Sequence, residues 1–111
     1  MSTLAKIFVG DEHPKRAIID QGAGDTAVVA AVSGKKIRVL SYYLVPAGSG
    51  VYRFESTAGG DALTGQMTPA DGTPIAANFN PLGHFETNAG EPLNLEAATA
   101  GCDGHLMYIE V

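Results

Sequence analysis

The sequence has few of the groups that crosslink or anchor a small protein. Tryptophan is absent from its 111 residues, cysteine occurs once, and charged side chains make up 17%. A single cysteine, Cys102, excludes an intrachain disulfide, and its neighbours Gly101 and Asp103 supply no cation that would stabilise a thiolate. No apolar run approaches the roughly 20 residues of a membrane helix. We therefore expect a single domain that is made in a cytoplasm and has no membrane partner. Its one thiol is expected to be reduced, and either buried or associated with a turn.

Basic residues are missing from the second half of the chain. All seven Lys and Arg lie in residues 1–53, whereas residues 54–111 hold eight of the twelve acids, and the net charge is −5. Two interpretations stay open: complementary faces that steer association, or two sets of solvated loops. An acidic chain is repelled by phosphates, so we expect no nucleic-acid partner.

Glycine and proline are plentiful, with 14 and 6 copies, which favours short elements joined by turns. Residues 36–45 are β-rich, and strict alternation places Ile37, Val39, Tyr43 and Val45 on one face, with apolar residues on the other face too. This pattern predicts a central strand covered on both sides. Further short strands are expected at 16–20, 26–32, 51–55, 75–79, 83–87, 92–97 and 105–111.

These segments predict an all-β protein: a β-sandwich, jelly-roll-like, of seven to nine short antiparallel strands. We expect one sandwich domain over residues 16–111, with one short strand inside the long connection 57–74. Residues 1–15 are expected to form an N-terminal arm or an edge strand.

No motif for catalysis or cofactor binding stands out. Residues 22–27 match a relaxed dinucleotide fingerprint, but the β-branched residues after them do not form the helix that must receive the pyrophosphate. The histidines lie far apart, at positions 13, 84 and 105, and we expect His84 to hydrogen-bond a turn carbonyl. Sequence spacing cannot show whether any two acids lie close enough to act as a carboxylate pair. We expect no enzyme activity, no cofactor and no metal.

Tyrosines on the expected strands could form a sugar-binding platform, but their usual place is a core or an interface, and sugar-binding sheets commonly present tryptophan. Carbohydrate binding is therefore the less favoured interpretation.

Four segments resemble small virion structural proteins of tailed phages: residues 31–45, 51–55, 80–95 and 104–111, with their strand, glycine turn, strand pattern. The resemblance implies a capsid decoration protein of the cement or staple type. Such a protein is a β-sandwich that binds the outer shell as a dimer or trimer and stabilises the head. The expected partners are then the major capsid protein and a second copy of this chain, and the expected location is the capsid surface. The resemblance transfers no individual site residue.

Candidate contacts with the shell or with other subunits come from two regions. The apolar residues of the N-terminal segment would act as an attachment arm, and the basic segment before and within the central strand would face an acidic shell. The candidates are Leu4, Ile7, Phe8, Lys35, Lys36, Arg38 and Tyr42. The alternative function is a receptor- or carbohydrate-binding β-sandwich module of a phage tail or tail fibre.

Overall fold

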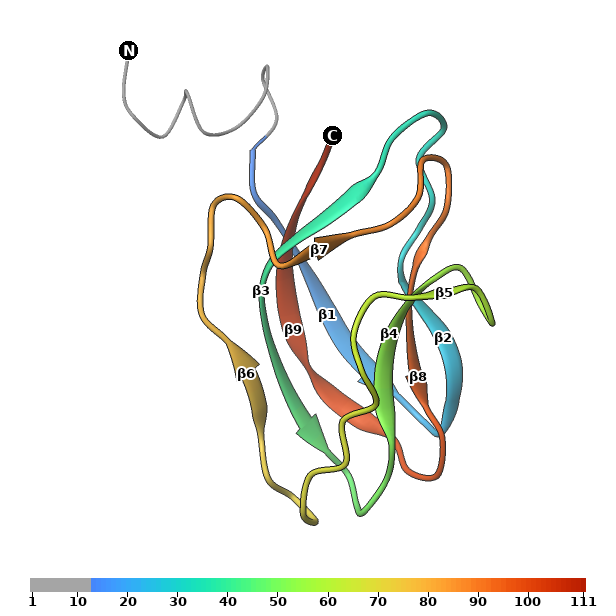
Figure 1. Ribbon diagram of the computed structural model, residues 1–111. Coiled ribbons are helices and arrows are strands. Elements are labelled where there is room, and N and C mark those ends of the chain that lie inside the picture. The colour runs from blue at the N-terminus through green and yellow to red at the C-terminus, as the bar shows by residue number, and fades with distance from the viewer. Residues whose placement is uncertain (1–12) are drawn as a thin grey trace.

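The structure is a computed structural model that describes residues 13–111. These residues form no helix, and so none that is long and apolar enough to cross a membrane. They form nine strands in two antiparallel sheets that pack face to face (Figure 1). The strands are β1 (Lys15–Gln21), β2 (Gly24–Val29), β3 (Ile37–Pro46), β4 (Tyr52–Ser56), β5 (Asp61–Ala62), β6 (Ile75–Ala77), β7 (Phe85–Glu86), β8 (Leu93–Ala97) and β9 (Cys102–Glu110).

The strand order is that of a jelly roll. Sheet A has the order β1-β9-β3-β6, with β7 pairing farther along the same strand β3, and sheet B has the order β2-β8-β4-β5. The pairs are nested in the sequence: β1 with β9, β2 with β8, β3 with β6 and β7, and β4 with β5. Each nested pair is antiparallel, as when one long hairpin is rolled into two layers. The predicted jelly-roll sandwich is therefore confirmed, including the short strand β5 within residues 57–74.

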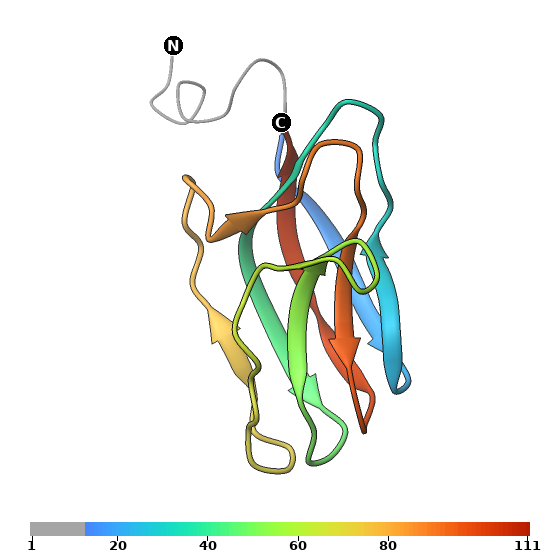
Figure 2. The same cartoon turned by 45° about the vertical axis from the view of Figure 1, so that its right-hand side comes forward.

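The core lies between the sheets and is built from alternating residues of both. Leu93, Leu95 and Ala97 of β8 belong to the same core cluster as Leu106 of β9, and all four are fully buried. The largest core side chains, Tyr52 and Phe54, come from β4. Figure 2 shows the two layers with β4 and β8 in front of β3 and β9. Cys102 is buried in this core as predicted, and burial raises the pKa of its thiol to about 11.

A β-bulge corrects the alternation predicted for β3. The register of β3 against β9 shifts between Val39 and Ser41, so Leu40 is an extra residue. Beyond the bulge, Tyr42 and Leu44 pack against the core, whereas Tyr43 is 41% exposed on the outer face. The prediction that Tyr43 shares a face with Ile37 and Val39 is wrong for this reason. The periodicity of the sequence does not reveal that one extra residue is inserted in a strand.

The outer face of β3 is covered over only part of its length. Leu40 and Ile109 are buried there in a small second cluster, with Met107 and Val111 packed against them. The cluster does not extend to Tyr43, so the prediction of a strand covered on both sides holds for the first half of β3 alone.

Candidate functional site

Two groups of residues stand out on the described surface: a cluster of carboxylates on the outer face of sheet B, and an apolar loop at the edge of sheet A that β6 and β7 form. The carboxylate cluster consists of Asp25, Glu55 and Glu96, each on a different strand. One carboxylate oxygen from each lies within 4.8 Å of the others. Strand pairing explains the meeting, because Asp25 pairs with Glu96 and Glu96 pairs with Arg53, next to Glu55.

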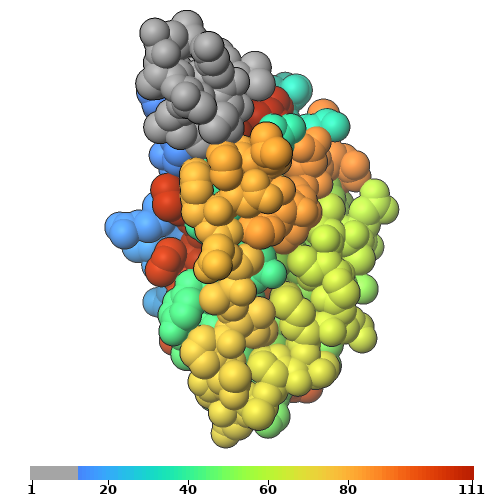
Figure 3. Space-filling view, turned by 60° about the vertical axis from the view of Figure 1, so that its left-hand side comes forward, coloured from blue at the N-terminus to red at the C-terminus, as the bar shows by residue number. Residues whose placement is uncertain are grey.

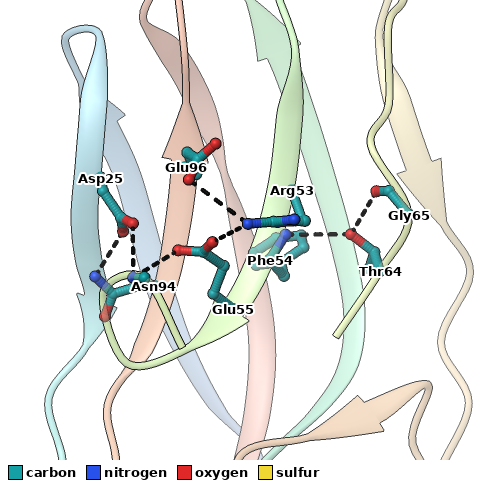
Figure 4. Close-up of polar contacts among 9 residues, drawn as sticks. Asp25, Arg53, Phe54, Glu55, Thr64, Gly65, Asn94 and Glu96 are labelled. Carbon is teal, nitrogen blue, oxygen red and sulfur yellow. Dashed lines mark hydrogen bonds and ion pairs between the residues drawn. The ribbon is translucent and has the colours of Figure 1, made fainter. Parts of the chain in front are cut away.

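A tight turn after β4 covers this cluster. Figure 4 shows the turn curling beneath Glu55, and the backbone N–H of Gly59 donates to both Asp25 Oδ2 and Glu55 Oε1 at 3.3 Å. Thr57 adopts a φ of 61°, a strained conformation for a β-branched residue. The turn thus excludes water from the Glu55 side chain, which is fully buried although it faces outward.

Arg53 and Asn94 complete the network (Figure 4). The Arg53 guanidinium contacts Glu55 Oε2 at 2.5 Å and Glu96 Oε2 at 3.8 Å, and Asn94 Nδ2 donates to Asp25 Oδ1 at 2.8 Å. Burial raises the pKa of Asp25, but hydrogen bonds with Glu55, Asn94 and Gly59 lower it further than burial raises it. Burial and the hydrogen bond with Asp25 raise the pKa of Glu55 above its ordinary value, against the effect of Arg53. Asp25 therefore holds the negative charge more readily than Glu55.

The chemistry of this cluster is that of an internal ion-pair network. Three carboxylates would suit a hard cation such as Ca²⁺. However, the Arg53 guanidinium already lies against two of them, and the Asn94 oxygen, which has no partner among the described residues, points away from the carboxylates (Figure 4). Sequence analysis could not find the cluster because its members come from three strands that are distant in the chain.

The second group is the loop of residues 78–84, which joins β6 to β7. Phe79 and Leu82 expose 49% and 75% of their surface there. Figure 3 shows this segment, in orange, on the side of the molecule that carries β6 and β7. Large hydrophobic side chains in such positions are typical of contact sites.

Hydrogen bonds hold this loop in one shape. The N–H of Asn80 donates to the Leu40 carbonyl at 2.8 Å, and the N–H of Leu82 donates to Asn80 Oδ1 at 3.0 Å. His84 Nε2 lies 2.7 Å from the Asn78 carbonyl oxygen, which confirms the turn contact predicted for this histidine. Gly83 has a φ of 88°, and a Cβ there would lie 2.5 Å from Arg38 Cγ, so the turn requires glycine. The apolar side chains are thus presented by a pre-formed loop.

Of the sequence-predicted contact residues, Arg38 lies against this loop, and Lys36 and Lys35 lie near strand β7 and the turn that follows it. Arg38 lies under Gly83, and Arg38 and Lys36 both pair with Glu86 of β7, at 2.9 and 3.2 Å. Lys35 precedes them in the turn before β3, where its carbonyl accepts a hydrogen bond from Gly90. Leu4, Ile7 and Phe8 lie outside the described residues, as does the rest of the arm up to residue 12.

Tyr42, the fourth candidate contact within the described region, is half-buried and packs inward. Its ring lies 5.2 Å from that of Phe54 and 6.1 Å from that of Phe85, and 6.2 Å from His84. Tyr42 therefore supports the base of the loop from the core side.

The exposed residues that sequence analysis missed are Phe79 and Leu82. The available signal was a pair of large apolar residues around Asn80-Pro81, a turn that offers nothing to bury them.

The charge segregation along the sequence does not produce two charged faces in space. Basic residues of the first half pair with acids of the second: Lys15 with Glu110 at 2.7 Å, Lys36 and Arg38 with Glu86, and Arg53 with Glu96. Antiparallel pairing of early with late strands brings the two halves together. Glu86 offsets one of the two positive charges of Lys36 and Arg38, so this part of the surface keeps a net positive charge.

Searches with this chain find no matching family model, no matching curated protein and no matching solved structure.

Proposed function

We propose that this chain is a tailed-phage capsid decoration protein that binds the outer shell, through its major capsid protein, and stabilises the head. The observation that carries the proposal is the pre-formed apolar loop of residues 78–84. It presents Phe79 and Leu82 near Arg38, which belongs to the basic segment that the sequence analysis proposed as a contact with the shell.

The physical argument rests on pre-organisation. A loop whose backbone is already hydrogen-bonded loses little conformational entropy on binding. More of the free energy gained from its apolar contacts therefore contributes to affinity. The ion pairs around Glu86 form a polar rim, as is usual around the buried centre of an interface.

Stabilisation follows from mass action. A protein that binds the assembled shell and not its separate subunits stabilises the shell by about 2.7 kcal/mol per site at a free concentration of one hundred times Kd. A shell offers many equivalent sites, so modest affinity at each suffices. We propose no catalytic role for the carboxylate cluster, which fastens β2, β8 and β4 together.

The test is binding to heads of the parent phage prepared without this protein. The wild-type chain should co-sediment with the heads, and the double variant F79S/L82S should bind at least about thirtyfold more weakly, the loss expected for one anchoring residue of an interface. The matched control is Tyr43→Ser, which removes an exposed aromatic side chain elsewhere on sheet A and should bind normally. Absence of wild-type binding, or equal binding by F79S/L82S, contradicts the proposal.

The second candidate function is the receptor- or carbohydrate-binding tail module. One observation favours it: Tyr43 is exposed on the outer face of sheet A, and its ring centre lies 6.0 Å from that of His105, tilted by 35°. An exposed ring of this kind can stack on a sugar. Glycan binding that is lost in Tyr43→Ser and kept in F79S/L82S would favour this function over shell binding.

A further inference from the structure

Among residues 13–111, strand β1 leaves one edge of sheet A without a neighbouring strand. It is the terminal strand of the order β1-β9-β3-β6, and within residues 13–111 its backbone pairs with β9 alone (Figures 1 and 2). Soluble proteins usually blunt such edges with charged side chains, a bulge, a proline or a very short strand, and of these devices β1 carries only charges, at Lys15, Arg16 and Asp20. β1 has seven residues, no proline and no register shift against β9, and Ile18 at its centre is 71% exposed. Its edge therefore remains competent for pairing.

The charges on β1 are arranged symmetrically about Ile18. Arg16, Ile18 and Asp20 alternate with inward residues, so all three point to the outer face, and all three are exposed. In the part of the chain that the structure describes, no ion pair involves Arg16 or Asp20. The two are four residues apart, about 13 Å along a strand, which is too far for them to pair within one chain.

We propose that two copies of this chain associate through β1, paired antiparallel about a two-fold axis at Ile18, so that their A sheets become continuous. A two-fold axis perpendicular to the sheet makes the strands antiparallel, and centring it on Ile18 sets the register. Arg16 then lies opposite Asp20 of the partner subunit, twice, and Ile18 lies opposite Ile18 of the partner subunit. The chain is thus complementary to a second copy of itself.

The inner face fits the same register. Ala17 would lie opposite Ile19 of the partner subunit, and in one protomer both Ala17 and Ile19 already pack against the core. The interface consists of one strand per protomer and is smaller than a standard interface of about 1,600 Å², so we expect a dissociation constant in the micromolar range. The pairing edge lies across sheet A from β6 and β7, which the 78–84 loop joins, so this inference stands independently of shell binding.

The test is charge exchange, followed by sedimentation equilibrium of the purified chain. Arg16→Glu and Asp20→Lys should each weaken dimerisation roughly tenfold or more, since two attractive cross-strand pairs become repulsive. The double variant R16E/D20K restores opposite charges in every pair and should dimerise like the wild type. A mixture of the two single variants should also form heterodimers, because each supplies the charge that the other lacks. Packing of Ile18 alone, without this register, would predict no such rescue.

Ile18→Lys tests the centre of the interface and should weaken dimerisation at least about thirtyfold, because it opposes two like charges on the axis. Its matched control is Leu82→Lys, which places the same charge at an equally exposed apolar site on the other edge and should leave dimerisation unchanged. Circular dichroism of each variant checks that the fold is retained. A wild-type chain that remains monomeric up to about 500 µM, or charge exchange without rescue, overturns the proposal.

Discussion

The outer faces of the two sheets carry different kinds of side chains, although the inner faces of both follow the same alternation of apolar residues. On sheet B, the outward side chains of β2, β8 and β4 are joined by Arg53, Asn94 and the Gly59 amide into one polar network. On sheet A, Leu40 and Ile109 are buried under a few neighbours, and Ile18 and Tyr43 remain exposed.

The difference indicates which surface is available to partners. A polar network whose charged groups are already paired with one another gains little from a new contact, whereas exposed apolar groups gain by burial. The exposed large hydrophobic residues within the described chain are Ile18, Tyr43, Phe79 and Leu82, on sheet A or on the loop that joins its strands β6 and β7. We therefore propose that contacts with partners are made through sheet A and not through sheet B.

The largest expected effect comes from the core that the two sheets share. Phe54→Ala removes a fully buried ring that lies 5.2 Å from both Tyr42 and Phe85, and should lower the free energy of unfolding by about 3–5 kcal/mol. Phe79→Ala is the matched control, because the same ring is half-exposed there, and should change stability by less than about 0.5 kcal/mol. Urea denaturation monitored by circular dichroism measures both. Similar losses in the two variants would show that Phe79 belongs to the core.

An intermediate effect tests the outer face of sheet A. Leu40→Ala should lower the free energy of unfolding by about 2–3 kcal/mol, near the lower end for a buried leucine, because the cluster around it is thin. Leu82→Ala, at an exposed leucine, is the control and should be close to neutral. A neutral Leu40→Ala would mean that the outer face of sheet A gains no stability from its own apolar residues.

The smallest effect is a difference in pH dependence between the sheets. The raised pKa of Glu55 means that folding favours its protonated form, so its stabilisation is present below its ordinary value of 4.5 and is lost as pH rises through the folded-state pKa. Glu86 on sheet A behaves oppositely. Burial raises its pKa, but Arg38 and Lys36 lower it by more, so its stabilisation is present above 4.5 and is lost as pH falls through the folded-state pKa.

Two glutamine variants separate these contributions. Glu55→Gln should remove the decrease in Tm that Glu55 causes as pH rises above 4.5. Glu86→Gln should remove the decrease in Tm that the loss of the Glu86 charge causes as pH falls below 4.5. Each effect should change Tm by a few degrees at most. Thermal melts from pH 3 to pH 8 provide the measurement. The same pH profile in both variants would show that the two carboxylates are not in different environments.

The sequence predicted the sandwich because its strands alternate regularly and are separated by Gly, Pro and Asn turns. In β9, Leu106 and Tyr108 pack against the core, and Met107 and Ile109 lie in the outer cluster, as regular alternation along a strand requires. Alternation failed in β3, where the extra residue at Leu40 reverses every side chain beyond it.

The candidate sites were less accessible to sequence analysis. The carboxylate cluster and the pairing of Lys36 with Glu86 depend on which strands become neighbours, and jelly-roll nesting joins residues 30 to 71 positions apart here. Phe79 was expected at the end of a strand over 75–79, but β6 ends at Ala77, and this places Phe79 on the exposed loop.

The most direct measurement is a cryo-EM map of the parent phage particle. The account predicts a jelly-roll density on the outside of the head shell at repeated sites, with the 78–84 loop directed at the major capsid protein and the outer face of sheet B directed away from it. A density confined to the tail or its fibres, or a head-bound density that contacts the shell through sheet B, would contradict the account.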